Sequence, residues 1–504
     1  METNRFIFVM MNESGEASVE EENQEQPKEA GKFIKIKKFT FIMGIFLLIF
    51  LTAGITTIAL TFGDEKVESL APDKHSEFEK LFSTYDTIKD NYYKDIDEDK
   101  LVDGAINGMI KSLDDPYSAY MDEKEASSFH ESISSSFEGI GAEIQEQDGH
   151  IMVVSPIKGS PAEKAGIKPN DIVMSVDGKS VKGLSSSEAV LKIRGEKGTK
   201  VNLTISRAGE SDPIEFTIKR DTIPIETVYA EMLDDGVAKI QVTSFSEHTV
   251  EELKSSLKEM SKKDMKGVVL DLRGNPGGLL DQAIDMASLF IPNGEVVLQV
   301  ENRSGKKEVY KSNNDGTLKK VPVVVLIDDG SASASEIVAA AVRESADIPL
   351  VGVKSFGKGT VQTAEDFDDG SNFKYTAAKW LTPEGNWIHK KGIKPDIEVK
   401  LPDYASLPYI SPDKELKESD SSSEVKAAEK MLKEAGHDPG KIDGFFDEET
   451  ANAVKAFQRD QKIKETGIIK DDTTVKLMEV IRDKILENDT QLKKAVEVVK
   501  KDIK

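Results

Sequence analysis

The chain has 504 residues, which is too many for a single hydrophobic core and predicts several domains. Asp and Glu total 91 against 67 Lys and Arg, so the net charge is −24. Binding to a phosphate backbone depends on basic patches that release counterions, and we therefore expect no nucleic-acid partner. The absence of cysteine excludes thiol catalysis, thiolate metal sites and disulfides.

The N-terminal part predicts a membrane anchor. Residues 39–62 carry no charged side chain, and a helix of that length, at ~1.5 Å per residue, crosses a hydrocarbon core of ~30 Å. Lysines precede the run and acids follow it, so residues 1–38 are expected in the cytoplasm and the domains on the outer, cell-wall side. The alternative is a cleaved secretory signal and a secreted form, but the run exceeds the usual signal core of ~7–15 residues.

Residues 74–137 predict a helical segment. Apolar residues recur there at spacings of three and four, first over 78–88 and again over 101–113, and each set forms one stripe of a helix. We expect a structural role for these helices. Dimerisation with a second copy of the chain is the alternative.

Residues 138–220 consist of short β-like runs separated by Gly, Pro and Asp, which predicts a small domain with several strands. The loop G-I-G-A at 139–142, the run S-P-A-E-K-A-G-I-K-P-N-D-I at 160–172 and V-D-G at 176–178 resemble a PDZ domain of the permuted bacterial type. The resemblance implies that the loop holds a peptide C-terminal carboxylate while the peptide adds as a strand. The residues implied in peptide binding are Gly139, Ile140, Gly141, Ala142 and Val190.

Residues 221–400 alternate between strand and helix patterns, which predicts an α/β domain. Continuous apolar runs at 267–272 and 321–327 read as buried strands. The turn R-G-N-P-G-G at 273–278 follows the first of them, at the edge of such a sheet where ligand-binding turns gather.

The C-terminal part predicts a linker, a small domain and a tail. Residues 401–423 are rich in Ser, Pro and acids and read as a linker. Residues 424–485 predict three helices, and I-D-G-x-F-x-x-x-T-x-x-A-V-x-x-F-Q at 442–458 resembles the peptidoglycan-binding module of cell-wall enzymes. The alternative is a packing or dimerisation module without glycan binding. Residues 486–504 predict a charged helical tail that is solvated.

The segment 328–362 carries the candidate chemistry. A serine cluster, S-A-S-A-S-E-I at 331–337, opens a helix, and one helix and one strand later Lys358 lies in a G-K-G turn. A serine needs a base, and a buried lysine serves as one when its pKa is lowered. The residue types leave open the alternative that the serines cap the helix and the lysine belongs to an ordinary turn.

Other chemistries are disfavoured. None of the six histidines lies in a G-x-S-x-G or H-E-x-x-H pattern, so we expect neither a histidine-based triad nor a metal site. Residues 352–358 fit G-x-x-x-x-G-K, but a glycine follows where a P-loop needs Ser or Thr, and no helix opens there. Nucleotide binding is therefore rejected and no cofactor is expected.

Residues 75–400 resemble the C-terminal processing (tail-specific) proteases, serine peptidases of the S41 type. The resemblance rests on motifs in family order: G-M-I-K-S-L-D-D-P-Y-S at 108–118, the PDZ segment, D-L-R-G-N-P-G-G at 271–278, S-A-S-A-S-E-I at 331–337, F-G-K-G-T-V-Q at 356–362 and L-T-P-E-G at 381–385. One departure is D-D-P-Y-S, where many relatives carry D-P-H-S, and it is expected to lie outside the catalytic set.

The resemblance implies a crotonase-like (tail-protease-like) α/β core and assigns roles. Ser333 is the implied nucleophile, Lys358 its base, and Gln362 the residue that positions the lysine. The implied oxyanion donors are backbone N–H groups of Ala334 and of one of two glycines, Gly277 or Gly278.

The sequence thus predicts a multidomain α/β and α+β protein, a membrane-anchored serine endopeptidase outside the cell. Its expected partners are proteins or peptides with accessible C-terminal tails, the membrane, and, as candidates, peptidoglycan and a second copy of the chain. Arg194, in the PDZ segment, is hypothesised to couple that domain to the active site, against the alternative of a solvated arginine. The rival function is a non-catalytic wall scaffold built on an inactive core.

Overall fold

The computed structural model of the chain describes residues 76–147, 149–313, 318 and 321–503. The chain divides into two compact units, Met1–Ile96 and Asp97–Lys504. The described elements of the first unit are η1 (Ser76–Phe78) and α2 (Glu79–Asn91). Within the described ranges no helix is both long and apolar enough to cross a membrane. The tail expected at 1–38 and the anchor expected at 39–62 lie outside those ranges.

The second unit opens with two capped helices. Asp97 accepts a hydrogen bond from the N–H of Lys100, and Asp122 accepts one from the N–H of Glu125, so each carboxylate satisfies a free donor at a helix start. The sequence pattern predicts only helix as far as residue 137, whereas the structure also has two strands there, too short to show a period of their own. The elements are α3 (Glu98–Lys111), β1 (Ala119–Met121), α4 (Glu123–Ser134) and β2 (Ser136–Gly139).

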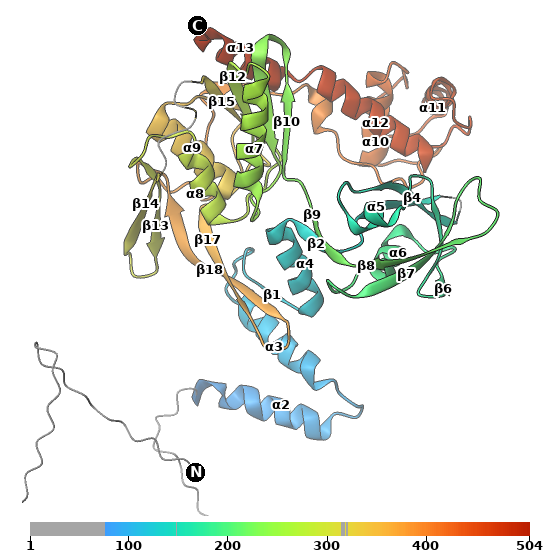
Figure 1. Ribbon diagram of the computed structural model, residues 1–504, viewed down its shortest axis with the longest axis horizontal. Helices are drawn as coiled ribbons and strands as arrows, with labels where there is room; N and C mark the ends of the chain where they lie inside the picture. Colours follow the sequence, from blue (N-terminus) through green and yellow to red (C-terminus); the bar gives the residue numbers. More distant parts are fainter. Residues whose placement is uncertain (1–75, 148, 314–317, 319–320, 504) are drawn as a thin grey trace, which may run out of the picture. The chain divides into compact units, whose positions relative to one another are not determined.

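The next part is an antiparallel sheet with two short helices and its own core (Figure 1). Its strands run in the order β3-β4-β5-β7-β8, and β6 pairs with β5. Ile151, Val201 and Ile205 are completely buried in its core. The elements are β3 (Ala142–Gln147), β4 (His150–Pro156), α5 (Pro161–Ala165), β5 (Ile172–Val176), β6 (Lys179–Ser180), α6 (Ser186–Ile193), β7 (Lys200–Ser206) and β8 (Ile214–Lys219). The strand β9 (Asp221–Pro224) follows and pairs with β2.

The third part contains the six-stranded sheet β10-β11-β12-β15-β16-β19, which is parallel except for the edge strand β10. A second sheet runs β1-β18-β13-β14, with β17 paired to β18. The elements are β10 (Val228–Met232), η2 (Asp234–Gly236), β11 (Val237–Val242), α7 (Thr249–Lys262), β12 (Gly267–Asp271), α8 (Leu280–Ser288), β13 (Val296–Asn302), β14 (Lys307–Lys311), β15 (Val323–Ile327), α9 (Ala334–Ala346), β16 (Leu350–Gly352), β17 (Thr360–Asp366), β18 (Asn372–Leu381) and β19 (Ile397–Glu398).

Both faces of the six-stranded sheet are covered, as a parallel sheet requires. Alternate residues of β12 point to opposite faces: Val268 and Leu270 join the apolar cluster that includes residues of α7, α8 and α9. Val269, between them, joins a second cluster. The predicted α/β alternation is therefore confirmed for this part, and the continuous apolar runs are explained by burial on both sides.

The C-terminal domain contains η3 (Asp403–Ser406), α10 (Ser423–Glu434), α11 (Glu448–Asp460) and α12 (Asp472–Glu487). The segment expected as a linker, residues 401–423, differs from that prediction. Ile410 and Leu416 lie in the domain's core, and Leu416 also pairs with Ile469 as an isolated β-bridge. Its isolated apolar residues anchor a chain whose composition is otherwise polar.

The charged tail expected at 486–504 forms a helix, α13 (Thr490–Asp502), but the prediction that it is solvated is wrong. Ala495 and Val499 are completely buried in the second apolar cluster, with Val269 of β12 and Leu326 of β15. α13 therefore covers the face of the central sheet opposite α7, α8 and α9 (Figure 1). Its lysines and glutamates mask an apolar stripe with a spacing of four residues.

Candidate functional site

Ser333 lies at the start of α9, with backbone angles φ 53° and ψ −111°. A residue with a side chain rarely adopts a positive φ, and such a conformation costs about 1–3 kcal/mol that the surroundings must offset. The two neighbouring serines are buried and bonded: Ser331 Oγ donates to the Leu272 carbonyl at 2.8 Å, and Ser335 Oγ donates to the Asn275 carbonyl at 2.9 Å. Of the three serines, Ser333 alone lines the large cleft.

Glu336, completely buried in the first turn of α9, ties the two halves of the site together. Its Oε2 accepts the backbone N–H of Ser333 at 2.9 Å and that of Lys358 at 2.8 Å. Its Oε1 accepts the N–H of Gly357 at 2.7 Å and the hydroxyl of Ser355. A single carboxylate thus fixes the backbone at the candidate nucleophile and at the candidate base.

Lys358 projects into the same cleft from the turn between β16 and β17. Burial lowers the pKa of its ammonium, and the nearby positive charge of Lys374 lowers it further, while Asp115 and Glu336 oppose the shift. Its Nζ lies 5.0 Å from the centre of the Tyr117 ring. Lys358 is therefore easier to deprotonate than an ordinary lysine, as a base must be.

The cleft has a volume of about 460 Å³ and brings together the residues that the resemblance named. Those that line it are Ser333, Ala334, Lys358, Gln362, Gly277 and Gly278. In the described part of the chain no hydrogen bond joins Ser333 Oγ to Lys358 Nζ, and the Gln362 amide donates to Thr360 Oγ1 at 2.9 Å. The structure thus places Gln362 beside the lysine's turn without a bond to the lysine.

The N-P-G-G turn faces Ser333. Gly277 has φ +103°, and a Cβ at this position would lie 2.8 Å from Ser333 Cβ and from the Ala332 carbonyl oxygen. Its N–H donates to Asn275 Oδ1 at 2.8 Å. Among the described residues, neither the N–H of Gly278 nor that of Ala334 has a protein acceptor. Two uncommitted donors thus line the cleft beside the serine.

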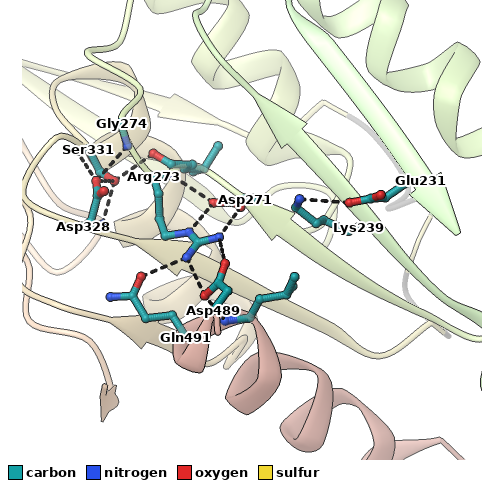
Figure 2. A network of polar contacts seen from close by, with 11 residues as sticks. Glu231, Lys239, Asp271, Arg273, Gly274, Asp328, Ser331, Asp489 and Gln491 are labelled. Carbon is teal, nitrogen blue, oxygen red and sulfur yellow. Dashed lines mark hydrogen bonds and ion pairs between the residues drawn. The ribbon is translucent and has the colours of Figure 1, made fainter. Parts of the chain in front are cut away.

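Side chains behind this turn hold it in place (Figure 2). Asp328 Oδ1 accepts the Gly274 N–H at 2.8 Å, which joins the turn to the loop that leads to Ser333. Asn275 Nδ2 donates to the Val242 carbonyl at 2.8 Å, and the Asn275 carbonyl accepts the N–H of Ala332 at 3.0 Å. Hydrogen bonds therefore join the N-P-G-G turn and the loop that carries Ser333 into one unit.

A second, smaller cavity of about 90 Å³ lies in the antiparallel domain. It is lined by the predicted peptide-binding residues Gly139, Ile140, Gly141, Ala142 and Val190, and also by Arg194. Arg194 Nη1 donates to Glu131 Oε2 at 2.8 Å, and its guanidinium lies 4.5 Å from the centre of the Phe137 ring. Glu131 belongs to α4, whose Phe129, Ser132 and Ile133 line the large cleft.

Sequence reasoning missed three residues that surround the candidate base Lys358. Glu336 had a local signal, since Ser-x-x-Glu is a capping pattern that predicts a carboxylate turned back toward the serine's backbone. Tyr117, expected outside the catalytic set, instead lies against Lys358. Lys374 also lines the cleft, with its Nζ 5.1 Å from the centre of the Phe129 ring. Neither Tyr117 nor Lys374 carries a local sequence signal.

Family models match four parts of the chain. Residues 236–399 match peptidase family S41, and residues 139–219 match a PDZ domain. Residues 57–125 match the N-terminal domain of the activating protease CtpB, and residues 421–477 match a peptidoglycan binding domain. The resemblances drawn from the sequence motifs are confirmed by these matches.

Curated relatives extend the similarity over nearly the whole chain. It is 53% identical to the carboxy-terminal processing protease CtpA of Bacillus subtilis, over 91% of this chain and 99% of the relative. It is 45% identical to CtpB of the same organism, over 84% of this chain and 89% of the relative. A probable CtpA-like serine protease of Staphylococcus aureus is 39% identical over 96% of this chain and 97% of the relative. The chain therefore belongs to the carboxy-terminal processing proteases of peptidase family S41, and it is a serine-type peptidase that carries a PDZ domain.

Proposed function

We propose that the peptidase cuts by a serine–lysine dyad, Ser333 and Lys358, with Gln362 as the residue that positions the lysine. The observation that carries this proposal is that the one serine of its cluster that lines the cleft shares it with a lysine whose pKa is lowered. Ser-Lys pairs are an accepted variant of the serine peptidase machinery.

In the proposed reaction Ser333 Oγ attacks the scissile carbonyl and its proton passes to neutral Lys358 Nζ. The carbonyl oxygen becomes an oxyanion that accepts hydrogen bonds from backbone N–H groups. We assign these donors to Ala334 and Gly278, because the Gly277 N–H already donates to Asn275. The C–N bond then breaks and protonated Lys358 gives its proton to the leaving amine. Water attacks the acyl-enzyme, its proton passes to Lys358 and on to Ser333 Oγ, and the acid leaves.

The test compares cleavage of an unstructured protein by the full chain and by Ser333→Ala. We expect at least a thousandfold loss of rate, because removal of a nucleophile leaves only binding and the oxyanion hole. Ser345→Ala, on the same helix α9, is the matched control and should stay active, since Ser345 Oγ bonds the Val296 carbonyl at the far end of the helix. Cleavage that survives Ser333→Ala contradicts the dyad. If neither the parent nor the variant cleaves, the wall scaffold is favoured.

We further propose that the PDZ domain captures the C-terminal tail of the substrate in the cavity at Gly139–Ala142, and that Arg194 reports its occupancy. The ion pair from Arg194 to Glu131 of α4 supports this, because α4 also lines the cleft. A bound peptide whose carboxylate pairs with Arg194 breaks the ion pair to Glu131, so α4 is no longer bonded to the PDZ domain through this pair.

The setting of the peptidase is also a proposal. We propose that residues 39–62 anchor it in the cell membrane with its domains on the outer side, and that the C-terminal domain binds peptidoglycan. The charge pattern around 39–62 and the match to a peptidoglycan binding domain support these two proposals. A homodimer is supported by three exposed apolar side chains, Val102 and Met109 of α3 and Leu113 just after it. Membrane fractionation, sedimentation with purified sacculi and analytical ultracentrifugation test the three in turn.

A further inference from the structure

Arg273, the arginine of the R-G-N-P-G-G turn, has no role in the proposed chemistry, yet it is almost buried. It follows β12 directly, and only 14% of its side chain is exposed. Its Nε and Nη2 donate to Asp271 at 2.8 and 2.7 Å. A buried guanidinium is stable only when its donors are paired, so its remaining partners are part of the fold.

Those partners come from the far end of the chain. Arg273 Nη1 and Nη2 donate to Asp489 at 3.0 and 2.8 Å, and Nη1 also donates to Gln491 Oε1 at 3.0 Å (Figure 2). Asp489 is the residue before α13, where its Oδ1 also accepts the N–H of Leu492. The start of α13 is thus bonded to the turn that carries the proposed oxyanion donor.

A shift of Arg273 would displace residues that line the cleft, because few bonds separate them. Gly278 lies five residues after Arg273, and the turn between them packs so closely on Ser333 that Gly277 has no room for a Cβ. On the Arg273 side, Asp489 and Gln491 are the fixed points contributed from outside the α/β domain. An error of ~1 Å in the placement of a catalytic group can cost about 10² in rate.

The same residues join the core to the C-terminal domain. α12, the last helix of that domain, ends at Glu487, and α13 begins at Thr490, so Asn488 and Asp489 alone separate them. Gln491 Nε2 donates to the Val399 carbonyl and Thr490 Oγ1 donates to the Lys400 carbonyl, which fixes the start of α13 to the chain after β19.

We propose that Asp489 is a positioning residue for peptide cleavage. Through Arg273, Asp489 holds the N-P-G-G turn in the position where the free N–H of Gly278 can donate to the oxyanion. This inference rests on the proposed function, because it acts through the proposed oxyanion donor. It gives the residue that precedes α13 a positioning role, separate from the packing role of Ala495 and Val499 further along the helix. It also makes the connection between α12 and α13 a point where the C-terminal domain meets the active site.

The test is Asp489→Asn in the full chain. Asparagine still caps α13 but carries no charge for Arg273, so the helix start is preserved while the ion pair is lost. We expect kcat to fall about tenfold, which is less than the 10²–10³ lost when an oxyanion donor is deleted. KM should stay within twofold, because the bound substrate has no oxyanion and the hydrogen bond to it forms only on the way to the tetrahedral intermediate. A peptidyl boronate, which forms a tetrahedral adduct, should bind about tenfold more weakly.

Two controls separate positioning from stability. Val499→Ala loosens the packing of α13 without touching Arg273 and should lower the melting temperature yet leave kcat unchanged well below it. Arg273→Lys cannot keep the planar fork that serves Asp271, Asp489 and Gln491 together, and it should repeat the kcat loss. The double variant Asp489→Asn, Arg273→Lys should lose less than the product of the two, because both break one link.

The inference is overturned if Asp489→Asn keeps the kcat and boronate affinity of the parent, or if its losses equal those of Val499→Ala at matched stability. Ser333→Ala, run in the same assay, distinguishes this from failure of the proposed function. If Ser333→Ala cleaves like the parent, the dyad is wrong and the Asp489 inference falls with it. If Ser333→Ala is inactive and Asp489→Asn is not impaired, only the Asp489 inference falls.

Discussion

Lys358, the proposed base, lies between charges of opposite sign, and the balance of these charges sets the pH range in which it is neutral. Burial and Lys374 lower the pKa of Lys358, whereas Asp115 and Glu336 favour its ammonium. A base works only when neutral, so the rate should rise with pH through the pKa of Lys358 and begin to rise below the ordinary range of lysine. The same desolvated ammonium destabilises the fold at lower pH, and stability from this group increases between its folded pKa and the unfolded value of about 10.4.

Lys374→Met tests this balance. Removal of the second cation lets Lys358 hold its proton to higher pH, so the rising limb of the kcat/KM profile should move to more alkaline pH. Lys307→Met, on β14, changes the net charge equally at a site outside the cleft and should leave the limb in place. A profile that does not move for Lys374→Met, measured at low ionic strength, contradicts the electrostatic role of Lys374.

At the scale of single residues, the sequence predicted a serine–lysine reaction but did not show which of the three serines is the nucleophile. Ser331, Ser333 and Ser335 alternate with alanine in one short run, and the family resemblance chose the middle serine as the nucleophile. The reason is tertiary: the carbonyls of Leu272 and Asn275, about 60 residues earlier, occupy the outer two hydroxyls. Tyr117 could not be predicted for the same reason, because it lies about 240 residues before Lys358 in the chain. Lys374 is only 16 residues after Lys358, but it approaches through the pairing of β17 with β18, which no local pattern shows.

Among the elements, β12 depends on a residue without a side chain. A Cβ added at Gly267 would overlap Val499 Cγ1 of α13. Glycine at the start of β12 therefore lets the C-terminal helix approach the sheet closely. The interpretation of 486–504 as a solvated tail failed because charges at nine of its 19 positions obscured the apolar residues that fill this space.

Gly267→Ala should destabilise the core by about 1–3 kcal/mol, since an added methyl in a closely packed layer displaces its neighbours. Val499→Ala alone also destabilises, but in the double variant the smaller residue makes room for the new methyl. The two losses should therefore be clearly less than additive in thermal melts. Strict additivity would show that α13 does not meet β12 at this glycine.

Over the whole molecule, the ion pair from Arg194 to Glu131 connects the PDZ domain, which is proposed to bind C-terminal tails, with the helix that borders the cleft. Both side chains are about one third exposed, at 38% and 32%, so the pair is worth little on its own and can be exchanged for another partner. Such a pair is suited to a switch because a bound carboxylate can compete for the arginine.

Arg194→Ala and Glu131→Ala should each alter the stimulation of cleavage by an added C-terminal peptide, and the double variant should match the single ones because both remove one contact. Lys197→Ala, which breaks a nearby exposed pair with Asp221, is the control and should keep the stimulation. Intact stimulation in Arg194→Ala would sink the coupling hypothesis. The ratio of rates with and without peptide is the measurement.

The position of α13 at the end of the chain also determines at which stage of synthesis the fold of the peptidase can be completed. A nascent chain completes β12, β15 and β16 while one face of their sheet is still bare, because the helix that covers it comes about 90 residues after residue 400. At synthesis rates of ~5–20 residues per second, that interval is about 5–20 s. During this interval the chain has the proposed nucleophile Ser333 and the proposed base Lys358 but lacks Asp489, the proposed anchor of the N-P-G-G turn. If Asp489 is a positioning residue, peptide cleavage is therefore slower during the interval in which this face of the sheet is still bare.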